Sequence, residues 1–333
     1  MRLSKRSCGD MVPTWHVTST ANLQYSAKGT SMSMHSLRAA VLLAIFQLTT
    51  SACAKEEESA QIKRSSGAAT QQKIMSDLVP IKGGSFLMGD FGPVHNEDKL
   101  PYSGAMNDDV LRKITLDGFS IMAHKVSIED FDAFTDATGR PRVGTSDLDA
   151  RRYRADVKAA AGVKWQDAVD FCAWAGAASG RKLTLPTEAQ WEFAARSGGK
   201  MVVYPTDTGT VDDGRNVASY SQHQDGSGTA LGRFPPNPAG LYDMIDHGYE
   251  WVQDWYEETY SGGDSRNPSG PKSGTEKVIR GNSNRGGDSL ALLSMTFTRD
   301  HRLPDPPKNK DIDGSEIDSN QNRSHGFRCV SQN

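Results

Sequence analysis

Cysteines have the most reactive side chains in this sequence, so their spacing gives the first indication of chemistry. The 333-residue chain has four of them, at Cys8, Cys53, Cys172 and Cys329. No Cys-x-x-Cys pair occurs, and the spacings match no zinc site. A cysteine-bound zinc centre is therefore not expected.

Histidines and carboxylates near the C-terminus are the other candidates for metal chemistry. Imidazole and carboxylate groups together suit a metal such as iron. His301, His325, Asp300 and Asp305 supply both kinds of group. Their spacing matches no ligand motif, and isolated histidines in a polar loop are usually surface residues. We keep an iron site only as an alternative.

An apolar run near the start of the chain predicts export. Residues 39–48 (AAVLLAIFQL) are shorter than the roughly 20 residues that span a bilayer, but they have the length of a signal-peptide core. Small residues then lead to Cys53, a pattern typical of a bacterial lipoprotein signal with an acylated thiol. An ordinary secretory signal cleaved near Ala52 or Ala54 is the alternative. We predict a disordered start plus signal peptide over 1–52, and lipidation at Cys53.

Composition divides the rest of the chain into a tether and a domain. Residues 53–77 are charged and small without an apolar period, which predicts a solvated tether. The domain follows over 78–331, in the periplasm or at the outer membrane of a bacterium, where disulfides are permissible. The net charge of −3 is spread along the chain, so no nucleic-acid partner is expected.

Local patterns predict a mixed α+β domain. A strand, a Gly-Gly turn and a second strand over 78–89 predict a hairpin, and the alternation over 112–121 predicts another strand. Helices are expected from the N-cap Ser127, over 164–179, and over 187–197 with a capping box.

Beyond about Gly198 the regular signals stop, and glycines, prolines and isolated aromatics continue almost to the end. A loop region of that length inside a compact domain needs cations or disulfides to hold it.

Five segments carry a family resemblance, and they occur in the family's order. They are GGSFLMG at 83–89, WQDAVDFCAWAGAASGRKLTLPTEAQWEFAAR at 165–196, RFPPNPAGLYDMIDHGYEWVQDWY at 233–256, VIRGNS at 278–283 and GFRC at 326–329. Over about Pro80–Val330 the chain resembles the formylglycine-generating (sulfatase-modifying factor) family. The resemblance implies an irregular, C-type-lectin-like α+β fold with little regular secondary structure, held by calcium.

The same resemblance implies two calcium sites, with the carboxylate and carbonyl oxygens that hard cations prefer. The first would use the side chains of Asp243 and Glu250 with the carbonyls of Asp246 and Gly248. The second would use the side chains of Asn216 and Asp225 with the carbonyls of Val217 and Ser227.

The resemblance also bears on the cysteines. It implies a disulfide between Cys172 and Cys329, whereas a second family disulfide would need cysteines near Ala195 and Thr296, which are absent. Such a bridge would stabilise the fold by constraining a long loop of the unfolded chain.

The family's catalytic cysteines are missing. Members that make formylglycine bind copper through two cysteines, whose positions here fall at about Gly286 and Ala291. Neither residue can ligate a metal, so copper and formylglycine generation by the known route are not expected. The remaining pocket candidates are Tyr249, Ser283 and Arg299.

Two functions remain open. The first is a calcium-stabilised binding or accessory module of the cell envelope, with an envelope protein, glycan or peptide as partner. Its variable surface would be the loops over 282–302 and 305–323. The second is a divergent periplasmic oxidoreductase, with a non-heme metal or without any cofactor, that acts on a secreted peptide or a siderophore-like metabolite. A fold does not imply a function, so the site has to decide between them.

Overall fold

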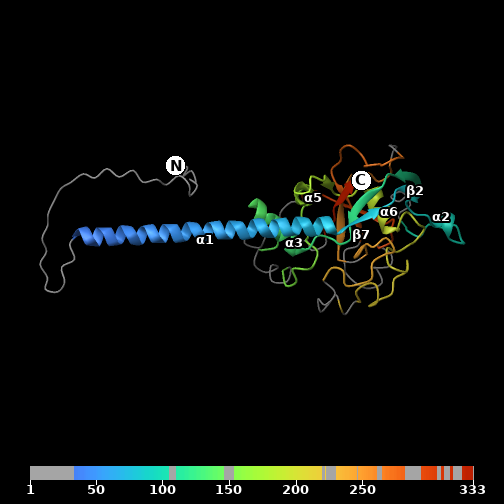
Figure 1. Ribbon diagram of the computed structural model, residues 1–333. Helices are drawn as coiled ribbons and strands as arrows, with labels where there is room; N and C mark the ends of the chain where they lie inside the picture. The colour runs from blue at the N-terminus through green and yellow to red at the C-terminus, as the bar shows by residue number, and fades with distance from the viewer. Residues whose placement is uncertain are drawn as a thin grey trace. The chain divides into compact units, whose positions relative to one another are not determined.

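The computed structural model describes most of the chain. It covers residues 34–104, 110–145, 154–219, 222, 230–245, 247–260, 265–281, 294–305, 309–310, 316–317 and 325–332, with the backbone alone over 34–53, 309–310 and 316–317. The chain divides into two compact units, Met1–Ser65 and Ser66–Asn333. The second unit holds all the strands that the structure describes (Figure 1).

Apart from the long α1, which begins in the first unit, short helices and short strands follow one another along the second unit, in agreement with the predicted α+β fold. The helices are α1 (Met34–Ser76), α2 (Gly92–His95), α3 (Ile128–Thr138), α5 (Trp165–Ala177) and α6 (Glu188–Ala195). The strands are β1 (Leu78–Ile81), β2 (Gly84–Met88), β3 (Arg112–Leu116), β4 (Phe119–Met122), β5 (Leu183–Thr184), β6 (Tyr249–Trp255), β7 (Lys277–Gly281), β8 (Arg299–Arg302), β9 (Asn309–Lys310), β10 (Glu316–Ile317), β11 (His325–Gly326) and β12 (Val330–Gln332).

The described strands form two four-stranded sheets and two pairs. One sheet has the order β1-β4-β12-β5 and the other β11-β6-β7-β8, while β2 pairs with β3 and β9 with β10. The second sheet lies beyond Gly198, where no strands were predicted. Strand β6 escaped prediction because three successive residues, from Glu250 to Val252, are all buried, so its sequence does not alternate.

The predicted hairpin over 78–89 is wrong. Strand β1 pairs with β4 and β2 pairs with β3, in a register that stays constant from Leu78 opposite Met122 to Met88 opposite Arg112. Residues 78–88 and 112–122 are thus two sides of one interrupted antiparallel ribbon. Gly83 is needed at the interruption, because a Cβ there would lie 2.4 Å from the carbonyl oxygen of Leu116.

The three predicted helices are present, and two of them begin with capping boxes. The Ser127 side chain accepts a hydrogen bond from the backbone N–H of Asp130, and the Asp130 side chain accepts one from the backbone N–H of Ser127. Thr187 and Gln190 do the same at the start of α6. Such boxes satisfy backbone donors that a helix start leaves free, so local sequence fixes both starts.

The prediction of a solvated tether up to residue 77 is wrong for its last part. Residues 54–76 are helical as the end of α1, and Ile74 is 1% exposed within the core. Gly67 packs against Trp174, and the Lys73 ammonium binds Asp130 at 2.8 Å. The sequence before Ile74 consists mostly of small and polar residues, such as Gly67, so it shows no apolar period that would predict a buried helix. Within the described part of the chain, no helix is long and apolar enough to cross a membrane.

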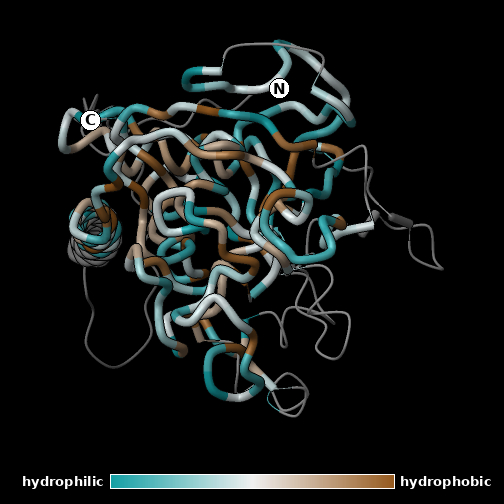
Figure 2. The backbone as a smooth tube through the Cα atoms, turned by 90° about the vertical axis from the view of Figure 1, so that its right-hand side faces the viewer, coloured by the Kyte–Doolittle hydropathy of each residue, from teal (hydrophilic) through white to brown (hydrophobic). Residues whose placement is uncertain are grey.

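Two large apolar clusters form the core, and Figure 2 shows the hydrophobic stretches of the tube gathering inside the domain. The first surrounds the disulfide and contains Phe131, Phe171 and Phe327. The second lies under α6 and contains Trp191 and Phe193.

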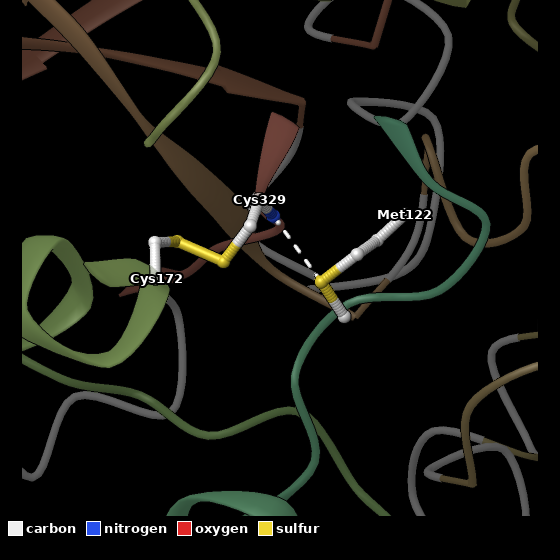
Figure 3. Close-up of a disulfide and its surroundings, with 3 residues drawn as sticks. All are labelled: Met122, Cys172 and Cys329. Atoms are coloured by element: carbon white, nitrogen blue, oxygen red, sulfur yellow. Dashed lines mark hydrogen bonds between the residues drawn. A yellow bond between two sulfur atoms is a disulfide. The ribbon is translucent and has the colours of Figure 1, made fainter. Parts of the chain in front are cut away.

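The disulfide Cys172–Cys329, implied by the resemblance, is present with a Cα–Cα distance of 5.6 Å. It joins α5 to the chain just before β12, and the backbone N–H of Cys329 faces the Met122 sulfur at 3.3 Å (Figure 3). The bridge therefore ties the C-terminal strand to a helix 157 residues earlier.

We predict that Cys172→Ala combined with Cys329→Ala lowers the free energy of unfolding by about 2–5 kcal/mol, because the bridge constrains a long loop of the unfolded chain. Urea unfolding of the two proteins measures the difference. Cys53→Ser is the matched control, because Cys53 lies outside the domain. Equal stability of the double variant and the wild type would contradict the prediction.

Candidate functional site

The loop that leads into β6 holds the first predicted calcium site. Its backbone is left-handed at Asp243 (φ 57°), His247 (φ 61°) and Gly248 (φ 83°), which turns the peptide groups sharply. Asp246, the fourth predicted ligand of this site, lies outside the described residues. Asp243 and Glu250 are both buried, at 9% and 0% exposure.

Glu250 is already bound by an arginine. The Arg328 guanidinium donates from Nε and from one Nη to the two carboxylate oxygens, each at 2.8 Å. The remaining donors of Arg328 reach the carbonyls of Met122, Ala123 and Tyr242. Both residues are fully buried, so this bidentate pair is complete without another ligand.

A lysine lies against the other predicted ligands. The Lys125 Nζ donates to the carbonyl oxygen of Gly248 at 2.5 Å and lies 3.8 Å from the Glu250 Oε1. The Lys125 side chain is fully buried. Two predicted calcium ligands therefore already face a cation, and these residues do not fit a calcium ion as they stand.

Asp243 makes two different contacts. One carboxylate oxygen accepts the backbone N–H of Gly232 at 2.8 Å, and the other lies 3.4 Å from the His247 Nε2. Burial alone would raise the pKa of Asp243, but the His247 hydrogen bond and the nearby Lys125 charge hold that pKa below its usual value. These contacts therefore favour the ionised form of the buried Asp243 side chain.

The second predicted calcium loop is only partly described, because Asp225 and Ser227 lie outside the described residues. The Asn216 side chain accepts from the backbone N–H of Asp212 at 2.8 Å and donates to the Thr210 carbonyl at 3.0 Å. The Val217 carbonyl accepts from the Gly214 N–H. Calcium at this loop remains a prediction. Asn216 and Asp243 line one small pocket, so the two loops are neighbours.

The two histidines proposed for an iron site lie far apart in the structure. His325 is on β11 and His301 is on β8, the two opposite edges of one four-stranded sheet. Two strands lie between them at about 4.8 Å per step, too far for a shared metal. His301 binds Glu276 at 2.7 Å, and the Asp305 carboxylate binds Lys164 at 2.7 Å. Among the described residues, no group of three His, Cys, Asp or Glu side chains could hold a metal.

The pocket candidates are likewise part of the scaffold where they are described. Arg299 binds Glu188 through Nε at 2.7 Å and is 9% exposed. Tyr249 is half-buried and stacks on His325 with ring centroids 6.0 Å apart. Ser283, with the positions of the missing cysteines, lies outside the described residues.

A buried charge network around α6 was not predicted from the sequence. Arg280 donates to Glu188 at 2.7 Å and to Glu192 at 2.9 Å, and Arg196 also binds Glu192. Every residue of α6 is buried. The available signal was the i, i+4 spacing of Glu188, Glu192 and Arg196 within the LPTEAQWEFAAR segment.

Asp254 lies at the edge of this network. It is 2% exposed, and one oxygen accepts the backbone N–H of Glu188 at 2.8 Å. Burial and the negative charge of Glu188 raise the pKa of Asp254 to about 7. Burial also lowers the pKa of Lys277, whose ammonium lies between the Trp165 and Trp255 rings, to about 8.

These features define a class: an α+β domain held by a disulfide and buried ion pairs, with its family segments gathered around α6 and β6. The sequence profile of the sulfatase-modifying factor enzyme 1-like domain matches residues 64–333. The chain therefore belongs to this sulfatase-modifying factor family.

Individual relatives agree. The chain is 29% identical over 282 residues to a mouse (Mus musculus) formylglycine-generating enzyme, covering 69% of this chain and 72% of the relative. It is 36% identical over 103 residues to a cattle (Bos taurus) protein named inactive C-alpha-formylglycine-generating enzyme 2, covering 28% of this chain and 32% of the relative. The solved structure of PvdO from Pseudomonas aeruginosa matches with a TM-score of 0.58 at 25% identity, covering 77% of this chain and 94% of that structure.

We predict that Asp254→Asn gains stability relative to the wild type as pH rises from about 4 to about 7. In this range the unfolded Asp254 has lost its proton while the folded one keeps it. Rising pH therefore favours unfolding of the wild type but does not act on the uncharged amide of the variant, and the difference levels off above about 7. Urea titrations at several pH values measure it, and a difference that is constant with pH would refute the assignment.

Proposed function

We propose that this chain is an exported, lipid-anchored binding or accessory module of the bacterial cell envelope, which uses the family scaffold without formylglycine-forming oxidation. Its partner would be an envelope protein, a glycan or a peptide. The anchor would be Cys53, in the periplasm or at the outer membrane.

One observation carries this proposal. The family's copper-binding cysteine positions fall at about Gly286 and Ala291, and neither side chain can bind copper or form a mixed disulfide with a substrate cysteine. The cattle relative named inactive supports a non-catalytic use of the scaffold. His301 and His325 lie at opposite edges of one sheet, so these two histidines do not support the metal site that the oxidoreductase alternative invoked.

The described charges support a structural use of the family segment that forms helix α6. Glu188, Glu192, Arg280 and Arg299 pair with one another inside the domain. Groups engaged in this way hold the scaffold rigid, and a rigid scaffold suits a module that presents loops to a partner. Most of the two loop segments proposed as that surface, 282–302 and 305–323, lie outside the described residues.

Enzyme assay tests the loss of catalysis. We predict that the purified chain, supplied with Cu(I), oxygen and a cysteine peptide of the sulfatase type, leaves the peptide cysteine unchanged by mass spectrometry. A formylglycine-generating relative that keeps its cysteine pair serves as the positive control. Conversion of the peptide cysteine to an aldehyde by this chain would overturn the proposal.

Cell fractionation tests the anchor. We predict that wild-type protein sediments with membranes, and that Cys53→Ser releases it into the soluble envelope fraction, because the acylated thiol is the attachment. Cys172→Ser combined with Cys329→Ser is the matched control and should stay with the membranes. Release of the wild type, or retention of Cys53→Ser, would contradict the anchor.

A further inference from the structure

Lys125 is the least expected charged residue of the domain. It follows shortly after β4, its side chain is fully buried, and its ammonium donates to the Gly248 carbonyl at 2.5 Å. The same ammonium lies 3.8 Å from the Glu250 carboxylate and contributes to the low pKa of Asp243. A buried ammonium requires such partners, because an isolated one costs several kcal/mol of desolvation.

The loop is shaped around this position. The backbone is left-handed at Asp243, His247 and Gly248, and the carbonyls of Tyr242 and Gly248 accept from the buried side chains of Arg328 and Lys125. A Cβ built on Gly281 would lie 3.5 Å from the Met244 carbonyl oxygen and 3.6 Å from that of Gly248, so these two oxygens converge beside β7. Carbonyl and carboxylate oxygens converging from a tight loop form the kind of environment that binds a hard cation.

The permanent charges at this loop are already balanced. Lys125 and Arg328 supply two positive charges, Glu250 and Asp243 supply two negative ones, and His247 beside Asp243 can only add positive charge. A calcium ion added to this arrangement would leave an excess of two positive charges in a buried volume. Ammonium differs from calcium in needing only three acceptors rather than six to eight oxygens, so it suits a smaller site.

We propose that the Lys125 ammonium takes the place of a metal ion at the loop from Asp243 to Glu250, so that the loop holds its shape without calcium. The lysine is covalently attached and cannot dissociate. The loop is then independent of the calcium concentration around the protein, whatever the loop near Asn216 binds.

Calcium stoichiometry separates the two loops. Equilibrium dialysis of the wild type against radioactive calcium should find at most one ion per chain, because, of the two predicted calcium loops, the one near Glu250 already holds the Lys125 ammonium. A wild type that binds two ions per chain would overturn the proposal without any variant.

The charge-reversing variant gives the positive result. Lys125→Glu leaves three carboxylates with Arg328 alone, a deficit of two charges that one calcium ion balances. We predict that it binds one more calcium ion per chain than the wild type, and that saturating calcium raises its Tm by about 5–10 °C more than it raises that of the wild type.

Two further variants keep the test decisive if Lys125→Glu fails to fold. Lys125→Met removes the ammonium at similar length and should lower the Tm, with calcium restoring part of the loss. Lys73→Met, which removes the ion pair with Asp130 on α3, is the matched control and should respond to calcium like the wild type. An unchanged Tm of Lys125→Met, or an equal calcium response of all the variants, would show that the ammonium does not stand in for a metal.

Discussion

The pair formed by Arg328 and Glu250 is the interaction on which the rest of the domain depends. All five N–H donors of Arg328 have an acceptor: the two Glu250 oxygens and the carbonyls of Met122, Ala123 and Tyr242. The attraction within a buried ion pair offsets the cost of desolvating the two charges only when their remaining hydrogen bonds are satisfied. In this pair they are satisfied. The arginine thereby joins the end of β4, the loop before β6 and the chain before β12. The neighbouring Cys329 bridges to α5, so both sheets and a helix meet at two consecutive residues.

Sequence reasoning succeeded where local signals decide the structure. Side chains at Ser127 and Thr187 cap their own helices, and the pairing of Cys172 with Cys329 followed from the family segments. It failed where distant segments decide. The pairing of 78–88 with 112–122 depends on close backbone contact at Gly83. The sequence Gly83-Gly84 was instead interpreted as the turn of a local hairpin.

The candidate site shows the same division. Asp243 and Glu250 were predicted as calcium ligands and both are buried, but nothing in the sequence marked Lys125 as a buried cation beside them. Lysines are almost never fully buried unless they are paired, so a lone lysine in a sequence is read as exposed. The ion pair of Arg299 was missed for a related reason, since its carboxylate partner Glu188 lies on α6, far away in the chain. The domain belongs to the sulfatase-modifying factor family by its scaffold, and its described charged groups hold that scaffold together.

The central claim is that internal cations, in place of bound metal, hold the loop around Glu250. The most direct measurement is anomalous X-ray scattering from crystals of the wild type grown with calcium and with copper. We expect ordinary nitrogen density for the Lys125 ammonium beside the Gly248 carbonyl, with no anomalous peak there for either metal. An anomalous peak between Gly248 and Glu250, with Lys125 displaced, would contradict it.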